Sequence, residues 1–303
     1  MTTTERENDA WTVARLVDWT REHFRKCGLE SPRLSAELLL AHCLGCERIQ
    51  LYARWDAVPD DDARAKFRAL VAKAGAHRPI AYLLGTKEFF SMPFEVTPDV
   101  LIPRPETEIL VERALELARA GGDDGQFRVL DLCTGSGCIA ISIAAHAPHA
   151  AVTATDISSE ALTVARRNAA RHSVADRIEF HHGDLYAALA EPDRFDAVVC
   201  NPPYVAEADA GALPKNVRDY EPHMALFAGP DGLAIIRRVV AGAADRLSPG
   251  GHLLLEVAYD QAATVRALFA ESQWGRVISH RDLGGHERVV HATRSAETRT
   301  QVA

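Results

Sequence analysis

The stretch from residue 129 to residue 137 reads VLDLCTGSG and decides the fold of most of the chain. Val129 and Leu130, followed by Asp131, are typical of the end of a buried strand, and residues 138–147 have the pattern of a helix. Gly135 and Gly137 lie between these segments, where glycine lets the backbone approach a ligand closely. A loop of small residues between a strand and a helix N-terminus predicts a binding site lined by backbone N–H groups.

From residue 105 onward, strand candidates alternate with helical segments. The helical segments fill the first four gaps between strand candidates, with 231–247 in the long fourth gap and 260–272 in the fifth. This alternation predicts an α/β fold with a mostly parallel seven-stranded sheet and helices on both faces. The last two strand candidates have no helix between them, which predicts an antiparallel pair at one edge. The strand candidates are Phe127–Asp131, Ala151–Asp156, Ile178–His182, Phe195–Cys200, His252–Val257, Arg276–Arg281 and Arg288–Ala292.

The part before residue 105 has a different pattern. Apolar residues recur at helical spacing up to residue 78, which predicts a small N-terminal helical bundle over residues 1–78. Residues 79–104 are rich in aromatic and branched side chains and are interrupted by Gly85, Pro93 and Pro98, which predicts a linker with a β-hairpin. The α/β domain is then expected over residues 105–296, followed by a disordered polar tail at 297–303.

Composition and charge exclude several classes of protein. The 34 Lys and Arg residues face 42 Asp and Glu, and the net charge of −8 disfavours a protein that binds nucleic acid through phosphates. No apolar run approaches the roughly 18–20 residues of a membrane span, and the polar N-terminus has no signal-peptide pattern. Cys43 and Cys46 have a metal-like spacing but lack a second ligand pair. We therefore expect a cytoplasmic protein with no metal, no membrane and no direct nucleic-acid partner.

Polar residues follow successive strands of the predicted sheet at the point where each strand ends. They are Asp131, Asp156, Asp184 and Asn201. The carboxyl ends of parallel strands meet in one crevice, so these side chains are expected to converge on a ligand. Asp131 beside the glycine loop disfavours phosphate and suits a cationic ligand such as a sulfonium amino acid, and Asp156 can accept both hydroxyl protons of a ribose. The alternative is that these residues only make turns, but their ordered series favours a site.

The tetrapeptide Asn201-Pro202-Pro203-Tyr204 directly follows the fourth strand. Two prolines cannot continue a central strand, so the chain must leave the sheet here in a stiff conformation. Asn201 offers a side-chain carbonyl acceptor, the loop backbone offers a second, and Tyr204 offers a flat face. A planar NH2 group is a poor nucleophile, and two acceptors that hold its protons would orient its nitrogen toward a methyl donor. A rigid turn without a catalytic role is the alternative, but the position after the fourth strand favours the clamp.

The order of these motifs resembles the class I (Rossmann-like) methyltransferases that methylate amide or amine nitrogens. The tetrapeptide is shared with adenine-N6 DNA methyltransferases, whereas the flanking segments are similar to those of the PrmC/HemK family. The resemblance covers roughly residues 10–294. It is carried by residues 79–83 (PIAYL), 88–89 (EF), 94–98 (FEVTP), 101–108 (LIPRPETE), 219–226 (DYEPHMAL) and 282–288 (DLGGHER).

This resemblance implies an enzyme that uses S-adenosylmethionine to methylate the side-chain amide nitrogen (N5) of a glutamine. The glutamine is that of the Gly-Gly-Gln (GGQ) motif in class I peptide chain release factors, and the N-terminal bundle would bind the partner. The glutamine would lie on Asn201, Pro202, Pro203 and Tyr204, which we take as the catalytic residues. From motif matching and strand-end position together, the expected donor-binding residues are Asp131, Cys133, Thr134, Gly135, Ser136, Gly137, Asp156, Asp184, Leu185 and Asn201.

Three positions leave alternatives open. Arg104 and Glu106 could face the substrate, although a helix start explains an acid there nearly as well. Many family members have glycine where this chain has Cys133, and a positive φ would be costly for a cysteine. The spelling Cys-Thr-Gly-Ser-Gly also occurs in a sister family that methylates a glutamine of a large-subunit ribosomal protein. That activity and adenine-N6 methylation of nucleic acid are therefore the alternative functions.

Overall fold

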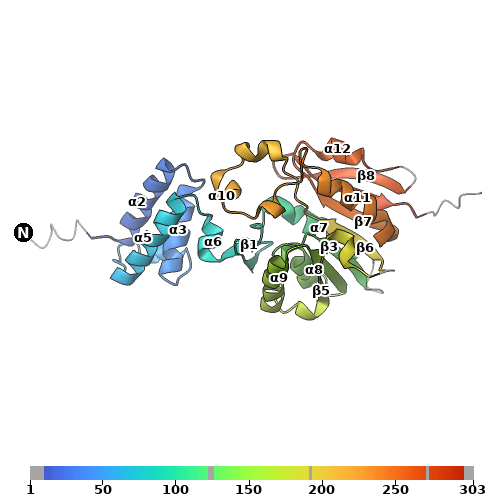
Figure 1. Cartoon of the computed structure of the whole chain (residues 1–303). Helices are drawn as coiled ribbons and strands as arrows, with labels where there is room; N and C mark the ends of the chain where they lie inside the picture. The colour runs from blue at the N-terminus through green and yellow to red at the C-terminus, as the bar shows by residue number, and fades with distance from the viewer. Residues whose placement is uncertain (1–9, 122–125, 191–192, 271–272, 297–303) are drawn as a thin grey trace, which may run out of the picture. The chain divides into compact units, whose positions relative to one another are not determined.

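The computed structural model describes residues 10–121, 126–190, 193–270 and 273–296 (Figure 1). These residues form two compact units. The first runs up to Gly85 and includes Pro214–Tyr220, and the second holds Thr86–Leu213 and the chain from Glu221 onward. Within the described ranges, the helices are all too short or too polar to cross a membrane. The tail predicted at 297–303 lies outside the described residues.

The first unit is helical, as predicted. Thr12 and Asp60 begin two of its helices, each accepting a hydrogen bond from a backbone N–H of the first turn. The side chains of Phe24, Leu39 and Phe67 are almost fully buried in its core. The helices are α2 (Val13–Lys26), α3 (Pro32–Cys43), α4 (Gln50–Ala53), α5 (Asp61–Gly75), α6 (Ile80–Leu84) and α10 (Lys215–Arg218).

The second unit begins with an antiparallel hairpin, β1 (Thr86–Phe89) and β2 (Met92–Glu95). Asn168 on α9 (Ser159–Arg171) holds β2 by exchanging two hydrogen bonds with the backbone of Glu95, at 2.7 and 3.0 Å. The side chain of Asn168 also donates to the carbonyl of Ser136 at 2.9 Å. One buried amide thus connects the hairpin to the loop that follows β3.

The predicted seven-stranded, mostly parallel sheet is confirmed (Figure 1). Its strand order is β5-β4-β3-β6-β7-β9-β8, and β9 alone runs in the opposite direction to the other six strands. The expected antiparallel pair does lie at an edge, but β9 is inserted between β7 and β8. The strands are β3 (Phe127–Leu132), β4 (Ala150–Asp156), β5 (Ile178–His182), β6 (Phe195–Cys200), β7 (Leu247–Glu256), β8 (Trp274–Arg281) and β9 (Glu287–Arg294).

Helices cover both faces of the sheet. Neighbouring residues of one strand point to opposite faces, so Val129 and Leu130 of β3 belong to different apolar cores. One core contains residues of α7 (Glu108–Ala120) and α8 (Cys138–His146), and the other contains residues of α11 (Ala234–Arg246) and α12 (Ala262–Arg266). Because both faces are buried, the central strands are apolar runs without alternation, which is typical of parallel sheets.

Two predicted helices differ from the structure. Between β5 and β6, the residues that the structure describes contain only a 3-10 turn, η3 (Leu185–Ala188). Because β4 and β3 separate β5 from β6, this connection must cross about 14 Å of sheet, which leaves little chain for a helix. The helix predicted at 260–272 is also shorter, because α12 ends at Arg266. Residues 271–272 of that prediction lie outside the described residues.

Candidate active site

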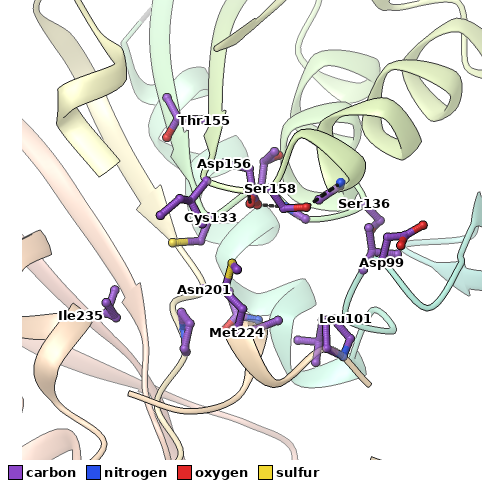
Figure 2. Close-up of a pocket in the computed structure, with 18 of the residues that line it drawn as sticks. Asp99, Leu101, Cys133, Ser136, Thr155, Asp156, Ser158, Asn201, Met224 and Ile235 are labelled. Atoms are coloured by element: carbon purple, nitrogen blue, oxygen red, sulfur yellow. Dashed lines mark hydrogen bonds between the residues drawn. The ribbon is translucent and has the colours of Figure 1, made fainter. Parts of the chain in front are cut away.

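A cavity of about 480 Å³ lies at the carboxyl ends of the parallel strands of the second unit (Figure 2). Cys133 after β3, Asp156 at the end of β4, Asp184 after β5 and Asn201 after β6 all line it. The structure therefore brings three of the four predicted strand-end residues to one place. The fourth, Asp131, does not line the cavity.

The loop after β3 is shaped by backbone conformations that glycine favours. Gly135 and Gly137 have φ values of 55° and 81°, and Cys133 also has a positive φ of 59°. A Cβ atom at position 137 would lie 2.8 Å from Ile141 Cδ1, so a side chain there would have to displace Ile141 in addition to adopting a strained φ. Cys133 also adopts the left-handed conformation, which costs a residue with a side chain roughly 1–2 kcal/mol. The loop therefore keeps its path in spite of the cysteine.

Asp131 lies beneath this loop and is fully buried. Its Oδ2 atom accepts hydrogen bonds from the Thr134 hydroxyl at 2.6 Å and from the backbone N–H of Ala140 at 3.2 Å. Burial raises the pKa of this carboxyl to about 7, and the hydrogen bonds from Thr134 and Ala140 oppose that rise. Asp131 thus connects the loop to α8 from below rather than facing a ligand.

Asp156 is the acid that faces the cavity from β4 (Figure 2). Its two carboxyl oxygens accept from the backbone N–H groups of Gly135 at 2.8 Å and Ser158 at 2.9 Å. Burial raises its pKa, although these hydrogen bonds oppose the rise. A carboxylate has about four acceptor positions, so the fixed carboxyl can still bind a hydroxyl group of a ligand.

Asp184 also lines the cavity but is more exposed than Asp156. Its Oδ2 atom forms an ion pair with Arg238 at 2.7 Å, and Arg238 lines the cavity too. The neighbouring Leu185 contributes an apolar surface and has a positive φ of 50°. The carboxyl of Asp184 is therefore partly neutralised by a cation that the sequence patterns did not single out.

Apolar walls complete the cavity, and most of them were not predicted. Leu101, Met224 and Ile235 come from three segments far apart in the sequence, and Ile157 directly follows Asp156 (Figure 2). Leu101 and Met224 belong to the segments LIPRPETE and DYEPHMAL, which carried the family resemblance, but neither residue was assigned a role. Further lining residues without a prediction are Pro98, Asp99, Val100, Pro103, Thr107, Cys138, Ile139, Thr155, Ser158, Glu160, Ala161, Gly183, Pro222, Ala225, Phe227 and Arg238.

The tetrapeptide after β6 contributes Asn201 and Pro203 to the cavity, whereas Pro202 and Tyr204 do not line it. Asn201 donates through Nδ2 to the Thr107 hydroxyl at 3.0 Å. The Tyr204 hydroxyl donates to Glu256 Oε1 at 3.4 Å, and its backbone carbonyl accepts from Gln261 at 3.0 Å. Tyr204 is thus turned into the protein, where burial raises the pKa of its phenol. It supports the loop instead of offering its face to the cavity.

Arg104 lines the cavity and Glu106 does not. The guanidinium of Arg104 forms an ion pair with the buried Glu221 at 2.5 Å. The other oxygen of Glu221 accepts from the backbone N–H of Ile102 at 3.1 Å. Glu221 therefore holds the segment that carries Arg104 against the cavity. For the residues described, the structure shows no cluster of three or more side chains able to hold a metal ion.

Two family models match the chain. The PrmC N-terminal domain matches residues 15–85, and the methyltransferase small domain matches residues 107–215. Among solved structures, the catalytic domain of hMettl16 in complex with hairpin 6 of the MAT2A 3′UTR superimposes with a TM-score of 0.56 and 18% identity. The match covers 76% of this chain and 84% of that one. At this identity the likeness shows a common fold only.

Relatives named release factor glutamine methyltransferase match the chain over nearly its whole length. The protein of Rhodopirellula baltica is 43% identical over 290 residues, which cover 94% of this chain and 98% of the relative. That of Burkholderia pseudomallei is 49% identical over 261 residues, covering 84% and 90%. That of Geobacter sulfurreducens is 41% identical over 282 residues, covering 93% and 96%. The chain therefore belongs to the family of release factor glutamine methyltransferases.

Proposed function

We propose that the chain uses S-adenosylmethionine to methylate the side-chain amide nitrogen (N5) of the glutamine in the GGQ motif of class I release factors. The observation that carries the proposal is the state of the Asn201 amide. Its NH2 group donates to Thr107, whereas its carbonyl oxygen has no hydrogen-bond partner among the described residues. A free, rigidly held acceptor beside the cavity suits a substrate with an NH2 group, and the names of the relatives point to glutamine.

The cavity has the chemistry to bind the proposed donor. Its size lies in the range of roughly 300–1,000 Å³ that is usual for small-molecule sites. Asp156 would accept the ribose hydroxyls, and the apolar Ile157, Leu185 and Ile235 would surround the adenine. The glycine loop would pass close to the amino acid part of the donor, where Gly135 leaves open space. When bound, the donor supplies an electrophilic methyl group on a positively charged sulfur.

The residues after β6 would then orient the acceptor nitrogen. Asn201 Oδ1 and a backbone carbonyl of the proline loop would accept the two amide protons and aim the nitrogen at the methyl carbon. As the new N–C bond forms and the S–C bond breaks, positive charge develops on the nitrogen, and both acceptors stabilise it. The nitrogen afterwards loses one proton to water. Strong base catalysis is not needed, which agrees with an asparagine at this position.

The partner would be a folded protein whose glutamine lies in an exposed loop. The two glycines beside the target would let that loop enter a narrow site with its backbone close to the wall. We propose that the N-terminal helical unit binds the body of the factor and so supplies binding energy remote from the reacting nitrogen. Its exposed apolar side chains Trp19, Ile49 and Tyr52 are candidates for this contact. A release-factor substrate would place the reaction in the cytoplasm.

The proposal is tested by offering three substrates in parallel with isotope-labelled donor. The substrates are a class I release factor, purified ribosomal proteins and DNA, and mass spectrometry locates the added methyl group. The expected product is the release factor with one methyl group on the GGQ glutamine. Methyl transfer to a ribosomal-protein glutamine would move the chain to the sister activity, and transfer to adenine would contradict the proposal.

A further inference from the structure

The orientation of the Asn201 amide depends on a hydroxyl from another segment. Thr107 ends the 3-10 turn η1 (Pro105–Thr107), 94 positions before Asn201, and its side chain is 2% exposed. Its Oγ1 atom lies 3.0 Å from Asn201 Nδ2, and both residues line the same cavity. Thr107 therefore decides which end of the Asn201 amide remains available to a substrate.

The carboxyl of Glu256 lies close enough to the Thr107 hydroxyl for a hydrogen bond between them to lower the pKa of Glu256. A hydroxyl carries one proton, so it can donate to one of these partners and must accept from the other. An ionised carboxylate only accepts. When Glu256 is ionised, Thr107 must donate to it and accept from the NH2 group of Asn201. The carbonyl oxygen of Asn201 is then left free for the substrate.

Glu256 is the last residue of β7 and is almost fully buried. Its Oε1 atom accepts from Tyr204 at 3.4 Å, whereas the buried Oε2 atom has no hydrogen bond of regular geometry in the described part of the chain and is free to accept from Thr107. Burial raises the pKa of Glu256 to about 7; Glu106 raises it further, while Thr107, Tyr204 and Arg288 lower it. The thiols of Cys138 and Cys200 also lie within its electrostatic influence.

We propose that Thr107 and Glu256 are positioning residues for the methyl transfer, holding the Asn201 amide with its oxygen toward the substrate nitrogen. This inference rests on the proposed function. A protonated Glu256 can donate to Thr107, which then donates its own proton to Asn201. The amide of Asn201 must turn over, and its NH2 group would face the NH2 group of the substrate. Two donors cannot bind each other, so transfer slows when Glu256 is protonated.

Two substitutions of Thr107 separate hydrogen bonding from packing. Thr107→Val keeps the shape of the side chain and removes the hydroxyl, whereas Thr107→Ser keeps the hydroxyl and removes a methyl group. The valine variant should lower kcat on the release factor about tenfold or more, because one hydrogen bond that orients the reacting group is lost. The serine variant should stay within about threefold of wild type. Both should bind S-adenosylhomocysteine with a Kd within about twofold of wild type.

A pH series with Glu256→Gln tests the protonation step. In the wild type, kcat should fall as the pH drops through about 7, where Glu256 becomes protonated. The glutamine variant cannot titrate and should lose this fall, while Asp131, with a pKa also raised to about 7, is present in both proteins as an internal control. Thermal melting confirms that each variant is folded.

The outcomes separate the two proposals. Equal kcat for the wild type and Thr107→Val, or identical pH profiles for the wild type and Glu256→Gln, would overturn the positioning role while leaving the proposed function intact. A proportional loss of donor binding and kcat in Thr107→Val would show a structural role and would also overturn it. A wild-type protein that leaves the factor unmethylated would overturn the proposed function and this inference with it.

Discussion

The loop after β3 and the loop after β6 line the same cavity but keep their shapes by different means. Residues 133–137 rely on backbone conformation, since Cys133, Gly135 and Gly137 all have positive φ values. Residues 201–204 rely on prolines and on side-chain hydrogen bonds, from Asn201 to Thr107 and from Tyr204 to Glu256. The first loop should therefore be sensitive to an added Cβ atom, and the second to the loss of one polar group.

The largest effect on activity is expected from a substitution in the loop after β6. Asn201→Ala removes the acceptor for the reacting amide, while the two prolines and the Tyr204–Glu256 hydrogen bond still support the loop. We expect kcat on the release factor to fall by about 10²–10³, as when one preorganised group that stabilises the transition state is removed. Donor affinity should change by less than about threefold, because the asparagine acts mainly in the transition state. Methyl-transfer rates and calorimetric titration of one preparation measure both. A loss of only a few-fold in transfer would contradict the clamp.

The loop after β3 should instead lose stability when a methyl group is added to one of its glycines. Gly137→Ala places a Cβ atom 2.8 Å from Ile141 Cδ1 and 3.1 Å from Ala165 Cβ, in addition to the strain of a positive φ. We expect a loss of about 2–4 kcal/mol in the free energy of unfolding, measured by denaturant titration. Gly135→Ala is the matched control, because its Cβ atom would meet nothing within 4 Å and only the strain of roughly 1–2 kcal/mol remains. Equal losses in the two variants would show that packing does not shape this loop.

Asp156 connects the two kinds of support, because its side chain holds the backbone of the first loop and faces the cavity. Asp156→Ala should weaken binding of S-adenosylhomocysteine by roughly 1.5–3 kcal/mol, the value of hydrogen bonds to a charged group. Asp184→Ala is the comparison, since its carboxyl is already paired with Arg238, and it should lose less. Calorimetric titration of the donor product ranks the two. Unchanged affinity in a folded Asp156→Ala protein would remove Asp156 from the donor site.

The smallest effect should be a gain. Cys133 has a φ of 59°, which glycine adopts without strain. Cys133→Gly should therefore raise the stability of the protein by about 1 kcal/mol, after allowing for the greater freedom of glycine in the unfolded chain. Thermal melting detects this as an increase in Tm. A decrease would mean that the partly buried thiol contributes more by packing than the backbone conformation costs.

The sequence predicted the parts of the fold and the site that follow from short-range patterns. The apolar runs located all seven strands, and the glycine loop, Asp156 and Asn201 were placed at the cavity because each directly follows a strand. The order of strands could not be predicted in the same way, since the insertion of β9 beside β7 depends on long-range pairing. For the same reason Met224, Ile235 and Arg238 were not expected to line the cavity.

The sequence also did not predict the directions in which some side chains point. Asp131 and Tyr204 stand at motif positions, but Asp131 lies beneath its loop and Tyr204 points toward Glu256. Thr107 was read only as part of a family segment, and its role depends on the 3.0 Å contact with Asn201. A hydrogen bond between residues so far apart in the sequence leaves no local pattern. The one signal for this contact in the sequence was that the family segments around Thr107 and Asn201 occur in the same chain.

Methylation in this account depends on the loop after β6, which holds the side-chain amide of a glutamine in the substrate protein. The most direct measurement is a competition in one tube between a class I release factor and the same factor with its motif changed to Gly-Gly-Asn, followed by mass spectrometry. We predict that the methyl group appears only on the unchanged factor and on the side-chain nitrogen of its GGQ glutamine. Equal labelling of both factors, or a methyl group at any other position, would contradict the account.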